Sequence, residues 1–122
     1  NGIIKISNES ITENLYYFKN KDIFRSSSVT FFFVYNAKVN MPNYGYMGYY
    51  YACLDAGIMI ELLTNALEYW NVGSCSIGDF NTEEITKILK LDSNEILLHI
   101  MEIGNKCNNT DYIQNIDTQK RY

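Results

Sequence analysis

Six consecutive residues of small or modest size, Gly73-Ser74-Cys75-Ser76-Ile77-Gly78, form the segment of this sequence best suited to holding a ligand. Glycine and serine carry little side-chain bulk, so a flat ligand can approach their backbone N–H groups closely. The segment directly follows a long apolar stretch, residues 49–71. We interpret it either as one wall of a cofactor site or as an ordinary turn between a helix and a strand.

Few other side chains in the sequence are suited to catalysis or metal binding. Tyr44 is one of eleven tyrosines, and its phenol is either a general acid or an aromatic side chain of a loop. The three cysteines, Cys53, Cys75 and Cys107, are odd in number and lack a CxxC spacing, so we expect packed thiols rather than a disulfide framework. His99 is the single histidine, and with cysteines this scattered we predict no metal site.

Charge and hydropathy exclude two classes of partner. The net charge is −4, whereas a non-specific nucleic-acid binder needs a basic face to neutralise phosphates. Asp55, Glu61 and Glu68 interrupt the most apolar stretch, so it falls short of the roughly 18 apolar residues of a membrane span. We therefore expect a cytoplasmic protein without nucleic-acid or membrane partners. The sequence begins at Asn1 rather than Met, and we expect a trimmed or processed product.

The first third of the chain contains two candidate strands. Residues 2–6 alternate and predict a short edge strand, and residues 10–19 begin with Ser-x-x-Glu, which is typical of a helical turn. Residues 28–35 (SVTFFFVY) are β-branched and aromatic on both faces and predict a buried central strand. Residues 36–48 contain the single proline and two glycines, and we predict a loop.

Residues 49–71 predict one long helix of about 34 Å. Apolar residues recur at spacings of three and four and also cover much of the opposite side, which leaves only a narrow acidic stripe. A helix that is apolar nearly all round lies in a large core or an interface. A chain of 122 residues has little material to enclose it, so we predict that a partner subunit covers the helix.

The remaining elements complete an α+β architecture in a single domain, residues 1–122. Residues 72–77 predict a short strand or extended turn. Residues 82–89 follow Asn81, a favourable N-cap, and predict a helix. Residues 95–103 (EILLHIMEI) predict a second sheet strand, and residues 105–122 a polar C-terminal arm.

Four spaced segments resemble a known flavoenzyme family. They are residues 44–45 (YG), 48–57 (GYYYACLDAG), 73–80 (GSCSIGDF) and 100–104 (IMEIG). Together they look like the C-terminal half of a nitroreductase-like domain, in particular the streptolysin-type azoline dehydrogenase branch. Enzymes of that branch oxidise thiazolines and oxazolines to azoles in peptide natural products. The likeness extends over roughly residues 22–106.

The resemblance implies a mixed sheet, with FMN bound at a homodimer interface built on the long helix. Ser76, Ile77 and Gly78 would lie along the isoalloxazine ring, and the Gly78 N–H would reach the flavin N5. Lys120 and Arg121 match the C-terminal basic residues that contact the FMN phosphate in many relatives. Basic residues at a chain end are otherwise a solvated tail.

Two features of the sequence depart from this pattern. The family's N-terminal arginine-rich phosphate motif is not in the sequence, so a companion chain is a possible source of that half. The Lys-Tyr pair of the azoline-oxidising branch reads Asn43-Tyr44. Three hypotheses remain open: an FMN-dependent oxidoreductase or one subunit of it, a flavin-free dimerising or scaffold subunit of a modification complex, and a nitroreductase that uses a nicotinamide donor.

Overall fold

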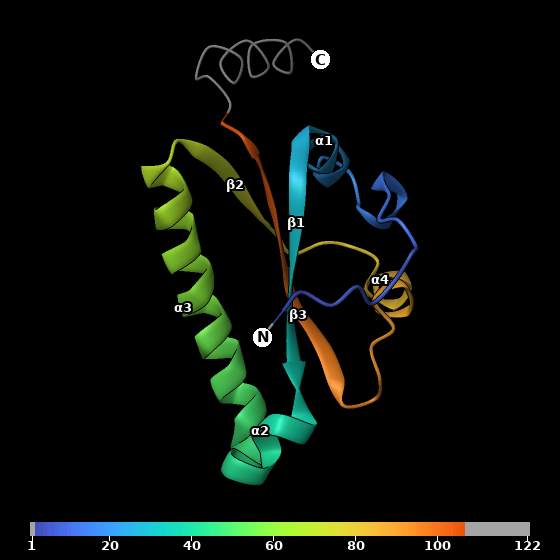
Figure 1. Ribbon diagram of the computed structural model, residues 1–122, viewed down its shortest axis with the longest axis vertical. Helices are drawn as coiled ribbons and strands as arrows, with labels where there is room; N and C mark the ends of the chain where they lie inside the picture. The colour runs from blue at the N-terminus through green and yellow to red at the C-terminus, as the bar shows by residue number, and fades with distance from the viewer. Residues whose placement is uncertain (1, 107–122) are drawn as a thin grey trace.

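The computed structural model describes residues 2–106 and consists of one three-stranded sheet with helices on both sides (Figure 1). The helix α3 runs along one face of the sheet, and α1, α4 and the N-terminal segment lie on the other side. In chain order the elements are η1 (Glu13–Leu15), α1 (Asn20–Ser26), β1 (Ser27–Asn36), α2 (Ala37–Tyr44), η2 (Gly45–Met47), α3 (Gly48–Tyr69), β2 (Val72–Ile77), α4 (Thr82–Leu89) and β3 (Glu95–Asn105). The predicted α+β class is confirmed.

The central strand of the sheet is β3, which pairs antiparallel with β1 on one side and β2 on the other. The sheet of residues 2–106 is therefore antiparallel rather than mixed. The predicted central position of residues 28–35 was wrong, because β1 lies at an edge and leaves Val29 and Phe31 exposed. Aromatic and β-branched residues suit any half-buried strand, so composition alone did not fix the position of β1.

Two local predictions in the first half of the chain also need correction. Residues 2–6 form no strand, and the Ile3 side chain is fully exposed. Alternation alone cannot make a strand where no neighbour supplies hydrogen bonds. Residues 36–48 are mainly helical rather than a loop. The Asn36 side chain accepts a hydrogen bond from the Val39 N–H at 3.3 Å and so caps α2, and Gly45 ends that helix at φ +56°.

The buried core lies on the side of the sheet opposite α3. It contains Leu15, Tyr16, Ile77, Ile85, Leu97 and Ile100. The helix α4 contributes Ile85 to it, and the Asn81 side chain accepts from the Glu84 N–H at 3.1 Å to cap that helix. The predicted bounds of α4 and β2 are confirmed, because their sequence signals are local.

The long helix α3 is also confirmed, but the residues described here scarcely bury it. Its 22 residues span about 33 Å, and only Gly48 and Ala56 are buried. Leu54, Ile58 and Leu62 are about half exposed or more. So much apolar surface on one helix is typical of an interface, and the partner that would cover it remains a prediction. None of the helices in residues 2–106 has the length and hydropathy that a bilayer crossing requires.

Candidate functional site

The turn that follows β2 presents an open backbone amide. Ile77, the last residue of β2, is buried and pairs with Ile100. Gly78 comes next and is exposed, and a Cβ atom built on it would meet nothing within 4 Å. Within residues 2–106 the Gly78 N–H has no hydrogen-bond acceptor. An unused donor at the end of an edge strand, with free space around it, is suited to a polar atom of a ligand.

A groove of about 410 Å³ begins beside this turn, between α3 and the β2–β3 pair. We call it the Ser76 groove. Its walls include Ser76 and His99 from the sheet and Tyr49, Cys53 and Gly57 from α3. Small residues keep the groove open, since a Cβ atom on Gly57 would also meet nothing within 4 Å. The Ser76 groove and the Gly78 amide lie two residues apart in the chain, and we treat them together as the candidate site.

His99 is a feature of this groove that the sequence did not identify. Its half-buried ring packs against Phe33, with 6.4 Å between ring centroids. Its Nε2 atom, however, is buried without a hydrogen-bond partner among the described residues. Burial lowers the pKa of His99, which favours the neutral imidazole. No sequence signal distinguishes a histidine with an unpartnered ring nitrogen from one whose two nitrogens both have hydrogen-bond partners.

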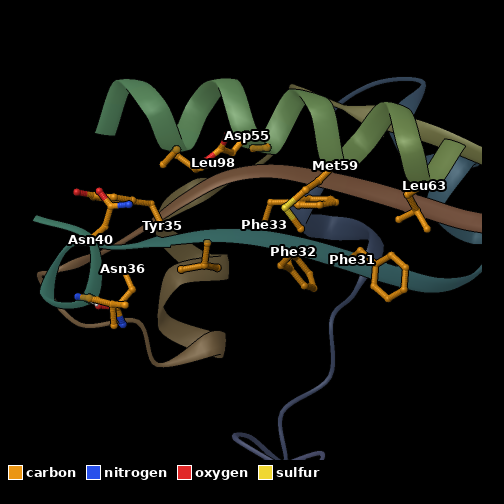
Figure 2. Close-up of a pocket in the computed structure, with 14 residues that line it drawn as sticks. Phe31, Phe32, Phe33, Tyr35, Asn36, Asn40, Asp55, Met59, Leu63 and Leu98 are labelled. Carbon is orange, nitrogen blue, oxygen red and sulfur yellow. Dashed lines mark hydrogen bonds between the residues drawn. The ribbon is translucent and has the colours of Figure 1, made fainter. Parts of the chain in front are cut away.

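A second groove, of about 630 Å³, lies between α3 and β1 (Figure 2). We call it the Phe33 groove. Met59 and Leu63 point from α3 toward β1 in Figure 2, so its walls are mainly apolar. Polar atoms gather at one end, where the buried Asn40 Oδ1 has no partner among residues 2–106. An apolar groove beside an exposed helix suits a packing partner at least as well as a small ligand.

The predicted site residues are only partly brought together. Ser76 lines the first groove and Gly78 does not, whereas the Ile77 side chain belongs to the core and only its backbone could face a ligand. Tyr44 ends α2, is 55% exposed and packs edge-to-face on Tyr51 with centroids 5.7 Å apart. It lines neither groove. Lys120 and Arg121 lie outside the described residues.

Positive charge is not found in either groove. In the part of the chain that the structure describes, no lysine or arginine lines them. Several cations are instead paired with acids elsewhere: Arg25 with Glu13, Lys38 with Asp92, and Lys106 with Glu68. A phosphate group in this site would need a cation from beyond residues 2–106. No group of three or more potential metal ligands occurs within that range either.

A buried polar cluster lies on the opposite face of the sheet. Glu102 on β3 is 1% exposed and accepts hydrogen bonds from the Tyr16 hydroxyl at 2.5 Å and the Thr30 hydroxyl at 2.9 Å. Burial, and then the bond to Glu102, raises the pKa of Tyr16. The neighbouring Cys75 thiol also has a raised pKa, first through burial and then through the Glu102 charge. The cluster keeps Tyr16 protonated and Cys75 an unreactive thiol.

Comparison with known proteins identifies the family to which this chain belongs. No curated protein sequence matches the chain. The model described as "Nitroreductase family" matches residues 4–105, which is most of the chain. That match includes the 76–78 turn, the long helix and all three strands. The chain therefore belongs to the nitroreductase family, within the superfamily of flavin-dependent oxidoreductases.

Proposed function

We propose that this chain binds FMN against the 76–78 turn and takes part in hydride transfer, either as the whole enzyme or as one of its subunits. The observation that carries the proposal is the open Gly78 N–H at the end of β2. Bound FMN supplies a ring that accepts or releases a hydride at N5. The role of this chain is to hold a hydrogen-bond donor at that edge of the ring, with Ser76 beside it.

The described residues suit the isoalloxazine ring of FMN better than they suit its phosphate. The free space at Gly78 and the small side chain of Ser76 suit a planar ring that approaches the backbone. The phosphate has no cation among the residues that line the grooves. We therefore propose that Lys120 and Arg121, or a companion chain, bind the phosphate. A guanidinium such as that of Arg121 can do so with two parallel hydrogen bonds.

The same reasoning supports a dimer or a complex with a companion chain. The apolar residues that α3 exposes would be covered by a second copy of the helix or by a protein that supplies the N-terminal half of the domain. Either partner would bring further residues to the edge of the Ser76 groove. The proposed FMN site would then lie at an interface.

For the substrate we propose an azoline in a peptide or another small oxidisable group. Oxidation of a thiazoline removes two hydrogens, one as a hydride that passes to the flavin and one as a proton. Support comes from the sequence resemblance of residues 44–57 and 73–80 alone. Tyr44 is the proposed proton-transfer residue, and its exposed position at the end of α2 means that a partner or substrate would have to enclose it. A mass decrease of about 2 Da in a thiazoline peptide would test the reaction.

The second candidate function is a flavin-free scaffold subunit. Among residues 2–106 no cation lines either groove, which favours it, because FMN affinity depends in part on the phosphate. Such a subunit would keep the exposed α3 surface for association and would show no turnover alone. Colourless protein that fails to bind added FMN, together with co-purification of a larger partner, would favour this function over the first.

The decisive experiment is an FMN titration of three proteins, followed by absorbance and flavin fluorescence. Gly78→Ala keeps the N–H, and its new Cβ meets nothing within 4 Å of the protein, so the variant should fold, and any weaker FMN binding would measure how closely the ring approaches the backbone. Gly78→Pro removes the N–H. The loss of one hydrogen bond should weaken binding by roughly 2- to 13-fold, with far-UV circular dichroism as the check on folding. Equal affinity of a folded Gly78→Pro variant would contradict the assigned role.

A second titration tests the phosphate end. Arg121→Ala should weaken the binding of FMN and leave the binding of riboflavin, which lacks the phosphate, unchanged. If both ligands weaken equally, Arg121 does not contact the phosphate. If neither changes, the phosphate cation comes from another residue or another chain.

A further inference from the structure

We infer that the N-terminal segment, residues 12–20, is a clamp that positions the Gly78 amide for the flavin. The inference rests on the proposed FMN site and adds positioning residues to it. Family resemblance assigns no role to this segment in the present chain. Its part in the site follows only from contacts between residues far apart in the sequence.

Two hydrogen bonds from the N-terminal segment hold the chain directly after Gly78. The Asn20 side-chain amide donates to the Asp79 carbonyl at 3.0 Å, and the Asn81 N–H donates to the Leu15 carbonyl at 2.7 Å. The second of these bonds flanks the antiparallel bridge between Tyr16 and Phe80. Residues 79 and 81 are thus each attached to the N-terminal segment. Before Gly78, the pairing of β2 with β3 holds Ile77. Gly78 is therefore fixed on both sides while its own N–H stays unused.

Tyr16 fastens the clamp to the sheet. Its side chain is fully buried, stacks on Phe24 with 4.7 Å between ring centroids, and donates to Glu102. Glu102 lies in β3, the strand that also pairs with β2. Movement of the N-terminal segment away from the 78–81 turn would therefore break a buried hydrogen bond as well as the contacts with the turn itself.

A clamp of this kind matters for chemistry because a fixed donor needs no reorganisation when charge develops on the ligand. A glycine in a free loop would lose conformational entropy each time it bound. Here the neighbouring residues carry the constraint, and Gly78 remains small enough for close approach. Asn20, Tyr16 and Leu15 are thus positioning residues that do not touch the ligand.

The test compares Asn20→Ala with the matched control Asn14→Ala in the full chain. Asn14 belongs to the same segment, is exposed and makes no side-chain hydrogen bond or ion pair among the described residues. The first readout is amide hydrogen exchange at Asn81, whose N–H donates to the Leu15 carbonyl, and this measurement needs no flavin. Loss of the Asn20 hydrogen bond should speed this exchange by roughly 2- to 13-fold, and the control should leave it unchanged. Asn20→Gln keeps the amide donor and should restore part of the protection.

The second readout is the absorbance spectrum and the midpoint potential of bound FMN. If the N-terminal segment only stabilised the fold, its mutation would change neither. Asn20→Ala should shift both, and Asn14→Ala should shift neither. Equal exchange in these two variants would overturn the clamp whether or not FMN binds. Faster exchange with an unaltered flavin would overturn its positioning role. If the wild type binds no FMN, the proposed function and the positioning role fail together, while the exchange data still decide whether the clamp exists.

Discussion

Replacement of Tyr16 by Phe tests the buried hydrogen bond that ties the N-terminal segment to the sheet. The change removes only the hydroxyl and keeps the ring, so the stack on Phe24 is retained. Glu102, 1% exposed, then keeps Thr30 as its single side-chain donor within residues 2–106. Water cannot replace the lost donor without opening the core, so the variant carries an incompletely satisfied buried group.

The expected cost is about 1–3 kcal/mol of unfolding free energy, the usual penalty for a buried polar group that loses its partner. A chain of 122 residues has an unfolding entropy of roughly 0.26 kcal/mol/K, from about 2.1 cal/mol/K per residue. The melting temperature should therefore fall by roughly 4–12 °C. Tyr17→Phe is the matched control, because Tyr17 is 42% exposed. It should change stability by less than about 0.5 kcal/mol.

The pH dependence gives a second and more specific readout. Burial and the bond to Glu102 raise the pKa of Tyr16 above its ordinary value of 10.0. As the pH rises, Tyr16 therefore loses its proton at a lower pH in the unfolded chain than in the folded one. The free energy of unfolding that Tyr16 contributes is full below about pH 10 and decreases as the pH rises further. The gap between the wild type and Tyr16→Phe in urea unfolding should be constant below pH 10 and should narrow above it. A gap no larger than that of Tyr17→Phe, or one that does not narrow, would refute the reasoning.

Three further outcomes follow from burial and exposure. Ile85→Ala should lower the unfolding free energy by about 2–5 kcal/mol in urea, because Ile85 is fully buried; a loss below 1 kcal/mol would contradict its place in the core. Burial lowers the pKa of His99, so the stability that the neutral ring contributes is present above about pH 6.5 and is lost as the pH falls. His99→Phe should flatten the stability profile between pH 7 and 5, and an unchanged slope there would count against the burial argument. Leu62→Lys should shift the sedimentation profile from dimer to monomer, since Leu62 is 65% exposed on α3; a wild type that sediments as a monomer would exclude a homodimer.

Elements with strong local signals were predictable from the sequence. The apolar run of α3 and the Asn81 cap of α4 depend on residues within a few positions of one another. The α2 helix was not predicted, because the proline and glycines of residues 36–48 indicated a loop, whereas in the structure Asn36 caps the helix. Pro42 lies inside this short helix, so a breaker residue is a weaker guide than the cap that precedes it.

The order of the strands was not predictable in this way. β1 and β3 are both long and apolar, and only pairing decides which of them takes the centre. β3 buries four consecutive residues, Ile100 to Ile103, and therefore both of its faces, while β1 leaves much of one face open. Sheet order is a property of contacts between distant segments, and periodicity within one segment does not report it.

The features of the candidate site were likewise predictable only where their sequence signal is local. The sequence by itself identified Ser76 and Gly78 as small residues that would let a ligand approach the backbone, and this role stays a prediction. Only the tertiary structure showed that Tyr44 lies outside both grooves and that His99 has an unpartnered nitrogen. It also decided that Asn20, 59 residues earlier in the chain than Asp79, holds the turn in place. A hydrogen bond across that separation forms only after the sheet has brought the two segments together, so no local pattern encodes it.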